Sequence, residues 1–145
     1  MTISLNRGRL LMQLGALLFL FGLLIGFFAP QLASPRMGLS SHLEGVMNGP
    51  FLIVAGLMWE RMHLGATSKT IAFWLLIYGA YANVPATFLA AWWPAGATMP
   101  IANQTAAGTE TQENIVLFLL FSCAFAMIAA TLQIIWGLRG NREVT

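Results

Sequence analysis

Four long apolar runs, almost free of charged residues, dominate this 145-residue chain. Only 8% of its residues are charged, whereas a soluble domain usually carries about 25%. A membrane-spanning helix needs about 20 apolar residues, and runs of that length cover residues 10–30, 41–61, 69–93 and 113–138. The sequence therefore predicts an all-α integral membrane protein, a single-domain four-helix bundle that uses these runs as its spans.

The basic residues indicate which side of the membrane each loop occupies. With four spans, both termini and the 61–69 turn share one side, and that side carries six of the seven Lys and Arg residues. The opposite side carries only Arg36. Because cytoplasmic loops are enriched in Lys and Arg, both termini are predicted to be cytoplasmic, in a multi-pass protein of the inner (cytoplasmic) membrane. No nucleic-acid partner is expected, since the cations sit at the ends of apolar runs.

The common signatures of soluble enzymes do not occur in the sequence. It has no Walker loop, no zinc-ligand spacing and no aspartate. Its single cysteine, Cys123, excludes an intrachain disulfide and is interpreted as a small buried hydrophobic residue. His63 falls in a polar turn and is interpreted as a surface residue.

One polar stretch leads into the second apolar run. Residues 36–50 contain His42, one of two histidines, together with Glu44. Ser40 or Ser41 is a candidate cap for the helix that follows, because a serine oxygen can accept from N–H groups of the first turn. Glu44 would then lie near the positive end of that helix, where a carboxylate is favoured. Polar groups that lead into an apolar helix are costly unless they have partners or a task.

Two asparagines are expected at the same depth in the membrane. Counting about 1.5 Å per residue from the helix ends places Asn48 and Asn83 in one layer of the outer half. Such a pair can join two helices by hydrogen bonds. It can also line a pocket for a small polar group, and the sequence leaves both interpretations open.

His42 stands at the end of a stripe of glycines. At about 100° per residue, Gly45 and Gly49 fall within about 60° of His42 on the helix surface. One interpretation is close helix packing through a Gly-xxx-Gly pair. The other is a flat cofactor that lies over the glycines, with His42 bound to its metal. His63 lies roughly 30 Å further along the helix, so the two histidines cannot bind one metal within a chain.

A long motif covers residues 35–49, PRMGLSSHLEGVMNG, and shorter ones follow at Phe73-Trp74, Tyr78-Gly79 and Tyr81-Ala-Asn83. With the Met-Pro-Ile-Ala loop at 99–102, these motifs resemble the hydroxylaminobenzene mutases over nearly the whole chain. The resemblance implies an isomerase that converts an arylhydroxylamine to a 2-aminophenol by moving the hydroxyl group from the nitrogen to the ring. The implied partner is therefore a small aromatic hydroxylamine, bound within the lipid bilayer.

His42, the Asn48-Gly49 pair six residues later and the run Ala82-Asn-Val84 are also similar to styrene oxide isomerase, a small four-span enzyme. This more distant likeness implies haem b at the interface of a homotrimer. It implies His42 as the axial ligand of the haem iron, with the iron acting as a Lewis acid. It also implies that Asn48 lies at the substrate.

The sequence differs from the styrene oxide isomerase pattern at two positions, where Thr87 and Gly79 replace a tyrosine and an aspartate of that family. Tyr78 or Tyr81 is a candidate to supply a phenol instead. The predicted catalytic residues are Asn48, Tyr78, Tyr81 and Asn83, and the predicted cofactor-binding residues are His42, Gly45 and Gly49.

Two kinds of function follow. In the enzyme, haem iron weakens the N–O bond, the apolar helices hold the aryl ring, and Asn48 orients the N–OH group. The rival is a small transporter or binding subunit without catalysis, with Glu44 as a proton-coupled site, because intramembrane carboxylates mark such pathways. The enzyme is the preferred hypothesis.

Overall fold

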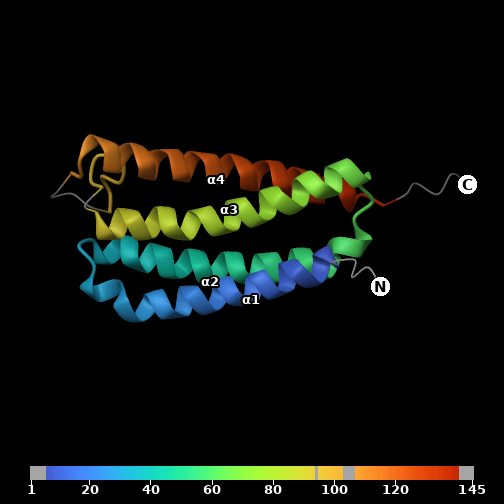
Figure 1. Ribbon diagram of the computed structural model, residues 1–145, viewed down its shortest axis with the longest axis horizontal. Coiled ribbons are helices and arrows are strands. Elements are labelled where there is room, and N and C mark those ends of the chain that lie inside the picture. The colour runs from blue at the N-terminus through green and yellow to red at the C-terminus, as the bar shows by residue number, and fades with distance from the viewer. Residues whose placement is uncertain (1–5, 94, 103–106, 141–145) are drawn as a thin grey trace, which may run out of the picture.

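The computed structural model describes residues 6–93, 95–102 and 107–140 (Figure 1). Helices make up most of this part of the chain, and it contains no strand. The predicted all-α fold with four helices is confirmed. The helices are α1 (Arg7–Phe28), α2 (Pro35–Met58), α3 (Ala66–Trp92) and α4 (Glu110–Gly137), with short 3₁₀ turns η1 (Ala29–Gln31) and η2 (Trp59–Arg61).

The four helices lie side by side in chain order, each antiparallel to the next (Figure 1). α1 packs on α2, α2 on α3, and α3 on α4. Among the described residues, α4 makes no comparable contact with α1 or α2. The bundle is therefore open, and α2 and α3 form its middle.

Three of the four helical segments are long and apolar enough to cross a membrane: Arg7–Gln31, which joins α1 to η1, and the helices α3 and α4. α2 has a similar length, 24 residues. Its surface is more polar, because it carries Arg36, His42, Glu44 and Asn48. The chain is thus a multi-pass membrane protein whose polar residues are concentrated on a helix placed between two others.

α2 begins six residues earlier than predicted. Pro35 takes the first helical position, where its missing N–H leaves no bond unmade, and Ser34 is the N-cap residue. Ser41, one of the two predicted caps, is instead buried inside α2, and its hydroxyl donates to the Val84 carbonyl at 3.0 Å. Glu44 consequently lies about 14 Å into the helix and not in its first turn.

Glycines bring α1 and α2 into backbone contact. A Cβ added at Gly45 would lie 2.5 Å from the Cα of Gly22, and one added at Gly49 would lie 2.7 Å from the Gly15 carbonyl oxygen. Small residues allow this close approach between membrane helices, where burial of apolar side chains gives little driving force. The interpretation of Gly45 and Gly49 as a Gly-xxx-Gly packing pair is confirmed.

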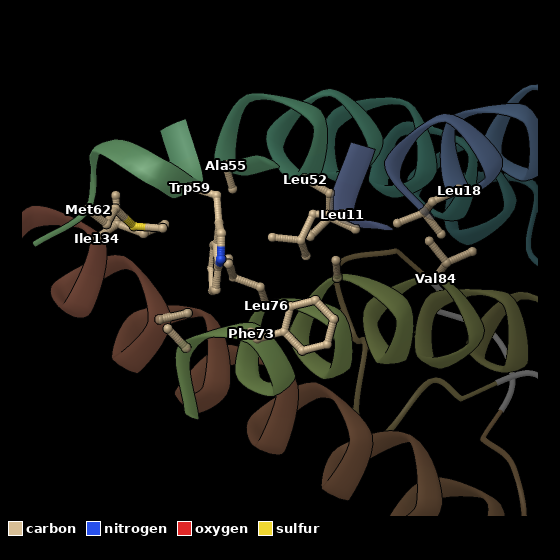
Figure 2. Packing of buried hydrophobic residues seen from close by; sticks show 13 residues of the cluster. Leu11, Leu18, Leu52, Ala55, Trp59, Met62, Phe73, Leu76, Val84 and Ile134 are labelled. Atoms are coloured by element: carbon tan, nitrogen blue, oxygen red, sulfur yellow. The ribbon is translucent and has the colours of Figure 1, made fainter. Parts of the chain in front are cut away.

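Larger apolar side chains fill the space between α1, α2 and α3 (Figure 2). Trp59 packs edge-on against Phe73, with 5.9 Å between the ring centroids. This core fixes the rotation of α2, so that its glycines face α1 while Ser41 faces α3. The largest fully buried members on the three helices are Leu11, Leu18, Leu52 and Leu76.

A buried carboxylate holds the loop between α3 and α4. Glu113 is 9% exposed and accepts from the backbone N–H groups of Ala97 at 3.1 Å, Thr98 at 2.8 Å and Gly108 at 3.0 Å. Hydrogen bonds to an ionised acceptor are roughly twice as strong as neutral ones. Glu113 is therefore a structural residue that fastens this loop to the start of α4.

Candidate functional site

Three half-buried polar side chains of α2 and α3 meet where these two helices pack. Glu44 and Asn48 lie one turn apart on α2, so their side chains are neighbours. The Asn48 Nδ2 atom donates to Oε2 of Glu44 at 2.9 Å. The Nδ2 atom of Asn83, from α3, donates to the same oxygen. The two asparagines therefore lie at one depth, as predicted, and Glu44 is the residue that joins them.

The two amide donors make the oxygens of Glu44 unequal. An oxygen that accepts two N–H groups is the acceptor end of a carboxyl group, so a proton on Glu44 belongs on the other oxygen, Oε1. In the described ranges, no hydrogen bond reaches Oε1. Glu44 can thus present Oε1 to a ligand as a donor when protonated and as an acceptor when ionised.

The exposure of this cluster distinguishes it from the structural carboxylate Glu113. Glu44, Asn48 and Asn83 are each half-buried, whereas Glu113 is buried. A polar group at this depth is costly in a bilayer unless it faces protein, water or a ligand. We therefore take Glu44, Asn48 and Asn83, here called the carboxyl–amide cluster, as the candidate site.

Two hydroxyl groups support the backbone that carries Asn83. Thr87 is buried, and its Oγ1 atom donates to the carbonyls of Asn83 at 2.9 Å and Val84 at 3.0 Å. Ser41 of α2 donates to the same Val84 carbonyl. Thr87 therefore positions Asn83 from within α3, and it does not point a hydroxyl toward the cluster.

The two tyrosines lie apart from the carboxyl–amide cluster. The Tyr78 hydroxyl pairs with the Ser122 hydroxyl of α4 at 2.7 Å, and the Tyr81 hydroxyl donates to the Leu14 carbonyl of α1 at 2.8 Å. Tyr81 and Asn83 are two residues apart and so point to nearly opposite sides of α3. The structure joins Asn48 with Asn83 and does not bring either tyrosine to them.

His42 packs against α1. Its Nδ1 atom lies 2.8 Å from the Gly22 carbonyl oxygen, so Nδ1 carries the proton that this bond requires. A Cβ added at Gly26 would lie 2.7 Å from the same ring nitrogen, which shows that the imidazole fills the space this glycine leaves. His63 is exposed, as predicted.

The prediction of haem b is wrong. Within the part of the chain that the structure describes, no group of three or more His, Cys, Asp or Glu residues could hold a metal ion. The room expected for a flat ring beside Gly45 and Gly49 is taken by the backbone of α1. The assignment of His42 as an axial iron ligand depended on that cofactor and is withdrawn with it.

Sequence reasoning missed the central place of Glu44. It placed Glu44 at a helix end and considered it only for the transporter hypothesis. The available signal was the spacing of Glu44 and Asn48, four residues apart on a helix that Pro35 can start. The link to Asn83 depends on how α2 and α3 pack, which the spacing does not give.

Comparison with known proteins gives concordant matches. Residues 7–139 match the model of the styrene oxide isomerase family. The chain is 50% identical over 132 residues to hydroxylaminobenzene mutase HabB of Ectopseudomonas oleovorans, which covers 90% of this chain and 80% of HabB. It is 46% identical over 125 residues to hydroxylaminobenzene mutase HabA of the same organism, covering 86% and 93% of the two chains. No solved structure matches significantly.

Proposed function

Since the chain belongs to the styrene oxide isomerase family and is an isomerase, we propose that it rearranges an arylhydroxylamine to a 2-aminophenol. The names of its mutase relatives support hydroxylaminobenzene as the substrate. The observation that carries the mechanism is the pair of amide N–H groups on one oxygen of Glu44. The same relatives favour catalysis over the rival transport function.

The reaction begins with the N–O bond of the substrate. In the proposed step, protonated Glu44 donates from Oε1 to the hydroxyl oxygen, so that oxygen carries less negative charge as the N–O bond breaks. The oxygen then forms a bond to the ortho carbon of the same ring. General acid–base catalysis of this kind contributes typically about 10²–10⁴-fold in rate.

The same side chain, Glu44, also completes the proton transfers of the reaction. Once the ortho carbon carries oxygen, the ionised Glu44 accepts the extra proton of that oxygen and passes it to the nitrogen, which becomes the amine. Glu44 then takes the proton from the ortho carbon and is protonated again. Reactant and product contain the same atoms, so the step requires no external oxidant, reductant or water. One carboxyl group that alternates between donor and acceptor is sufficient.

The asparagines hold the carboxyl group in a fixed orientation. Asn48 from α2 and Asn83 from α3 both donate to Oε2, so Oε1 keeps its position whether or not it carries the proton. Positioning a catalytic group in this way removes rotational freedom before the reaction starts. The aryl ring is expected to lie against apolar side chains that keep bulk water from the departing oxygen.

We also propose that the working protein is a homotrimer. The carboxyl–amide cluster is half-exposed in the single chain, at a depth where lipid would solvate it poorly. A neighbouring copy that packs against the exposed part of the cluster would enclose the site. Native mass spectrometry or light scattering of active protein in mild detergent is expected to give the mass of three chains. Full activity in a fraction that contains only monomers would contradict this assembly.

The proposed orientation places the turn before α3 in the cytoplasm and the loop before α4 outside, with the four predicted runs as spans. His63 and Ala107 are exposed residues of these two segments. In a Cys123→Ser background, an impermeant maleimide is expected to label Ala107→Cys on intact cells, and His63→Cys only after permeabilisation. The reverse labelling pattern would show that the protein has the opposite orientation in the membrane.

The proposed activity is tested on purified protein in lipid nanodiscs. Hydroxylaminobenzene is expected to disappear and 2-aminophenol to form in equal amount, with no added electron donor or acceptor. Absence of 2-aminophenol from folded protein would contradict the proposed substrate.

A further inference from the structure

A second site lies at the end of the bundle where α1 and α3 begin. There the starts of both helices and the turn η2 surround an open cavity of about 920 Å³. Trp59, one of its lining residues, is 15 residues from Glu44 along the chain, or about 22 Å at helical rise. The cavity is thus separate from the carboxyl–amide cluster, and the proposed reaction does not use it.

The cavity has a positive charge balance. Arg7 and Lys69 line it together with one carboxylate, the exposed Glu60. The Arg7 guanidinium is held in place, because its Nη1 atom donates to the Thr70 hydroxyl at 2.8 Å and its Cζ atom lies 5.5 Å from the centre of the Phe73 ring. A guanidinium has five N–H donors in a fork that fits phosphate oxygens, so donors remain for a ligand.

Aromatic rings line the same cavity as the charged groups. Trp59 is 3% exposed, whereas Trp74 is 62% exposed. The edge of the Phe73 ring stands against Trp74, with 5.3 Å between the ring centroids. Tryptophans of membrane proteins concentrate at the level of the lipid headgroups. The cavity therefore offers both cations and apolar ring surface.

We propose that this cavity binds the phosphate headgroup of an anionic phospholipid. Arg7 and Lys69 contact the phosphate, and the acyl chains run along Trp74. A zwitterionic lipid would bring its own cation to a site that already holds two, so a net negative headgroup fits better. Basic pockets between membrane helices are suited to such headgroups.

The test measures lipid retained by the protein. Nanodiscs with equal parts of phosphatidylglycerol and phosphatidylcholine are used, and native mass spectrometry counts the lipids that remain bound. The wild-type protein is expected to retain phosphatidylglycerol preferentially, by about fivefold or more, and Lys69→Gln is expected to lose about fivefold of that preference. Arg7→Lys, which keeps the charge but not the fork, should lose part of it.

The matched controls are Arg9→Gln and Arg61→Gln, which remove exposed cations at the same end of the bundle but outside this cavity. These two variants should retain the wild-type preference. Loss of preference in the controls equal to that in Lys69→Gln would overturn the site, because it would indicate only general surface charge. Equal retention of both lipids by the wild type would also overturn it.

A soluble phosphate ester is the other source of the same chemistry. Glycerol 3-phosphate is therefore added to protein in phosphatidylcholine nanodiscs, and the unfolding temperature is compared with that in phosphatidylglycerol nanodiscs. Stabilisation by phosphatidylglycerol alone, reduced in Lys69→Gln, supports the lipid site. Equal stabilisation by glycerol 3-phosphate would indicate that the cavity binds a soluble phosphate ester, and it would overturn the lipid proposal.

Discussion

Glu44→Gln is expected to lower kcat by about 10²-fold or more while KM changes little, because it removes the group proposed to move the proton. The glutamine carbonyl can still accept from Asn48 and Asn83, as Oε2 of Glu44 does. Its amide nitrogen then takes the place of Oε1, and that nitrogen cannot exchange a proton with the substrate. Rates are measured on purified protein whose helix content and oligomer size match the wild type.

Two further variants serve as comparisons for Glu44→Gln. Glu110→Gln removes an exposed carboxylate from the first turn of α4 and should leave kcat within about twofold, as most surface substitutions away from a site do. Asn48→Ala should slow turnover less than Glu44→Gln, because Asn83 still holds the carboxyl group. Full activity of a folded Glu44→Gln protein would remove Glu44 from the mechanism.

Gly45→Leu is expected to weaken the pairing of α1 with α2 and to lower the unfolding midpoint. Even the first side-chain carbon would lie 2.5 Å from the Gly22 Cα, which is backbone and cannot rotate away. Overpacking of a tight interface costs typically about 1–3 kcal/mol, and more where the backbone must move. A loss of this size is large against the roughly 5–15 kcal/mol that stabilises a folded protein. The measurement is the thermal unfolding midpoint in detergent.

Gly65→Ala provides the matched comparison, because a Cβ at Gly65 meets no atom within 4 Å. Gly65 is the N-cap residue of α3, so this change should cost at most about 1 kcal/mol. Unfolding midpoints for Gly45→Leu and Gly65→Ala that lie equally close to the wild type would show that the α1–α2 contact is looser than described.

The helices were predictable because charged residues are confined to the ends of the apolar runs. The start of α2 was not, because Ser40 and Ser41 have the chemistry of caps while Pro35 has the backbone geometry of a first helical residue. That error moved Glu44 to a helix end. The local sequence offers two possible starts for α2 and does not decide between them. The choice depends on packing, because Ser41 is buried against α3 and donates to the Val84 carbonyl.

The glycines illustrate a second limit. A glycine stripe on α2 predicts a close neighbour but does not say whether the neighbour is a cofactor or a helix. Gly15 and Gly22 lie seven residues apart on α1, so they share one face and were the available sign of a helical partner. Pairing them with Gly49 and Gly45 requires the register of α1 against α2, which depends on the whole interface.

The most direct test of the proposed hydroxyl transfer is the origin of the oxygen in 2-aminophenol. Purified protein converts hydroxylaminobenzene in water enriched in ¹⁸O, and mass spectrometry measures the label in the product. The proposed transfer within one substrate molecule predicts 2-aminophenol without ¹⁸O, formed by wild-type protein about 10²-fold or more faster than by Glu44→Gln. Incorporation of ¹⁸O at the level of the solvent would contradict it, because the oxygen would then come from water and not from the substrate.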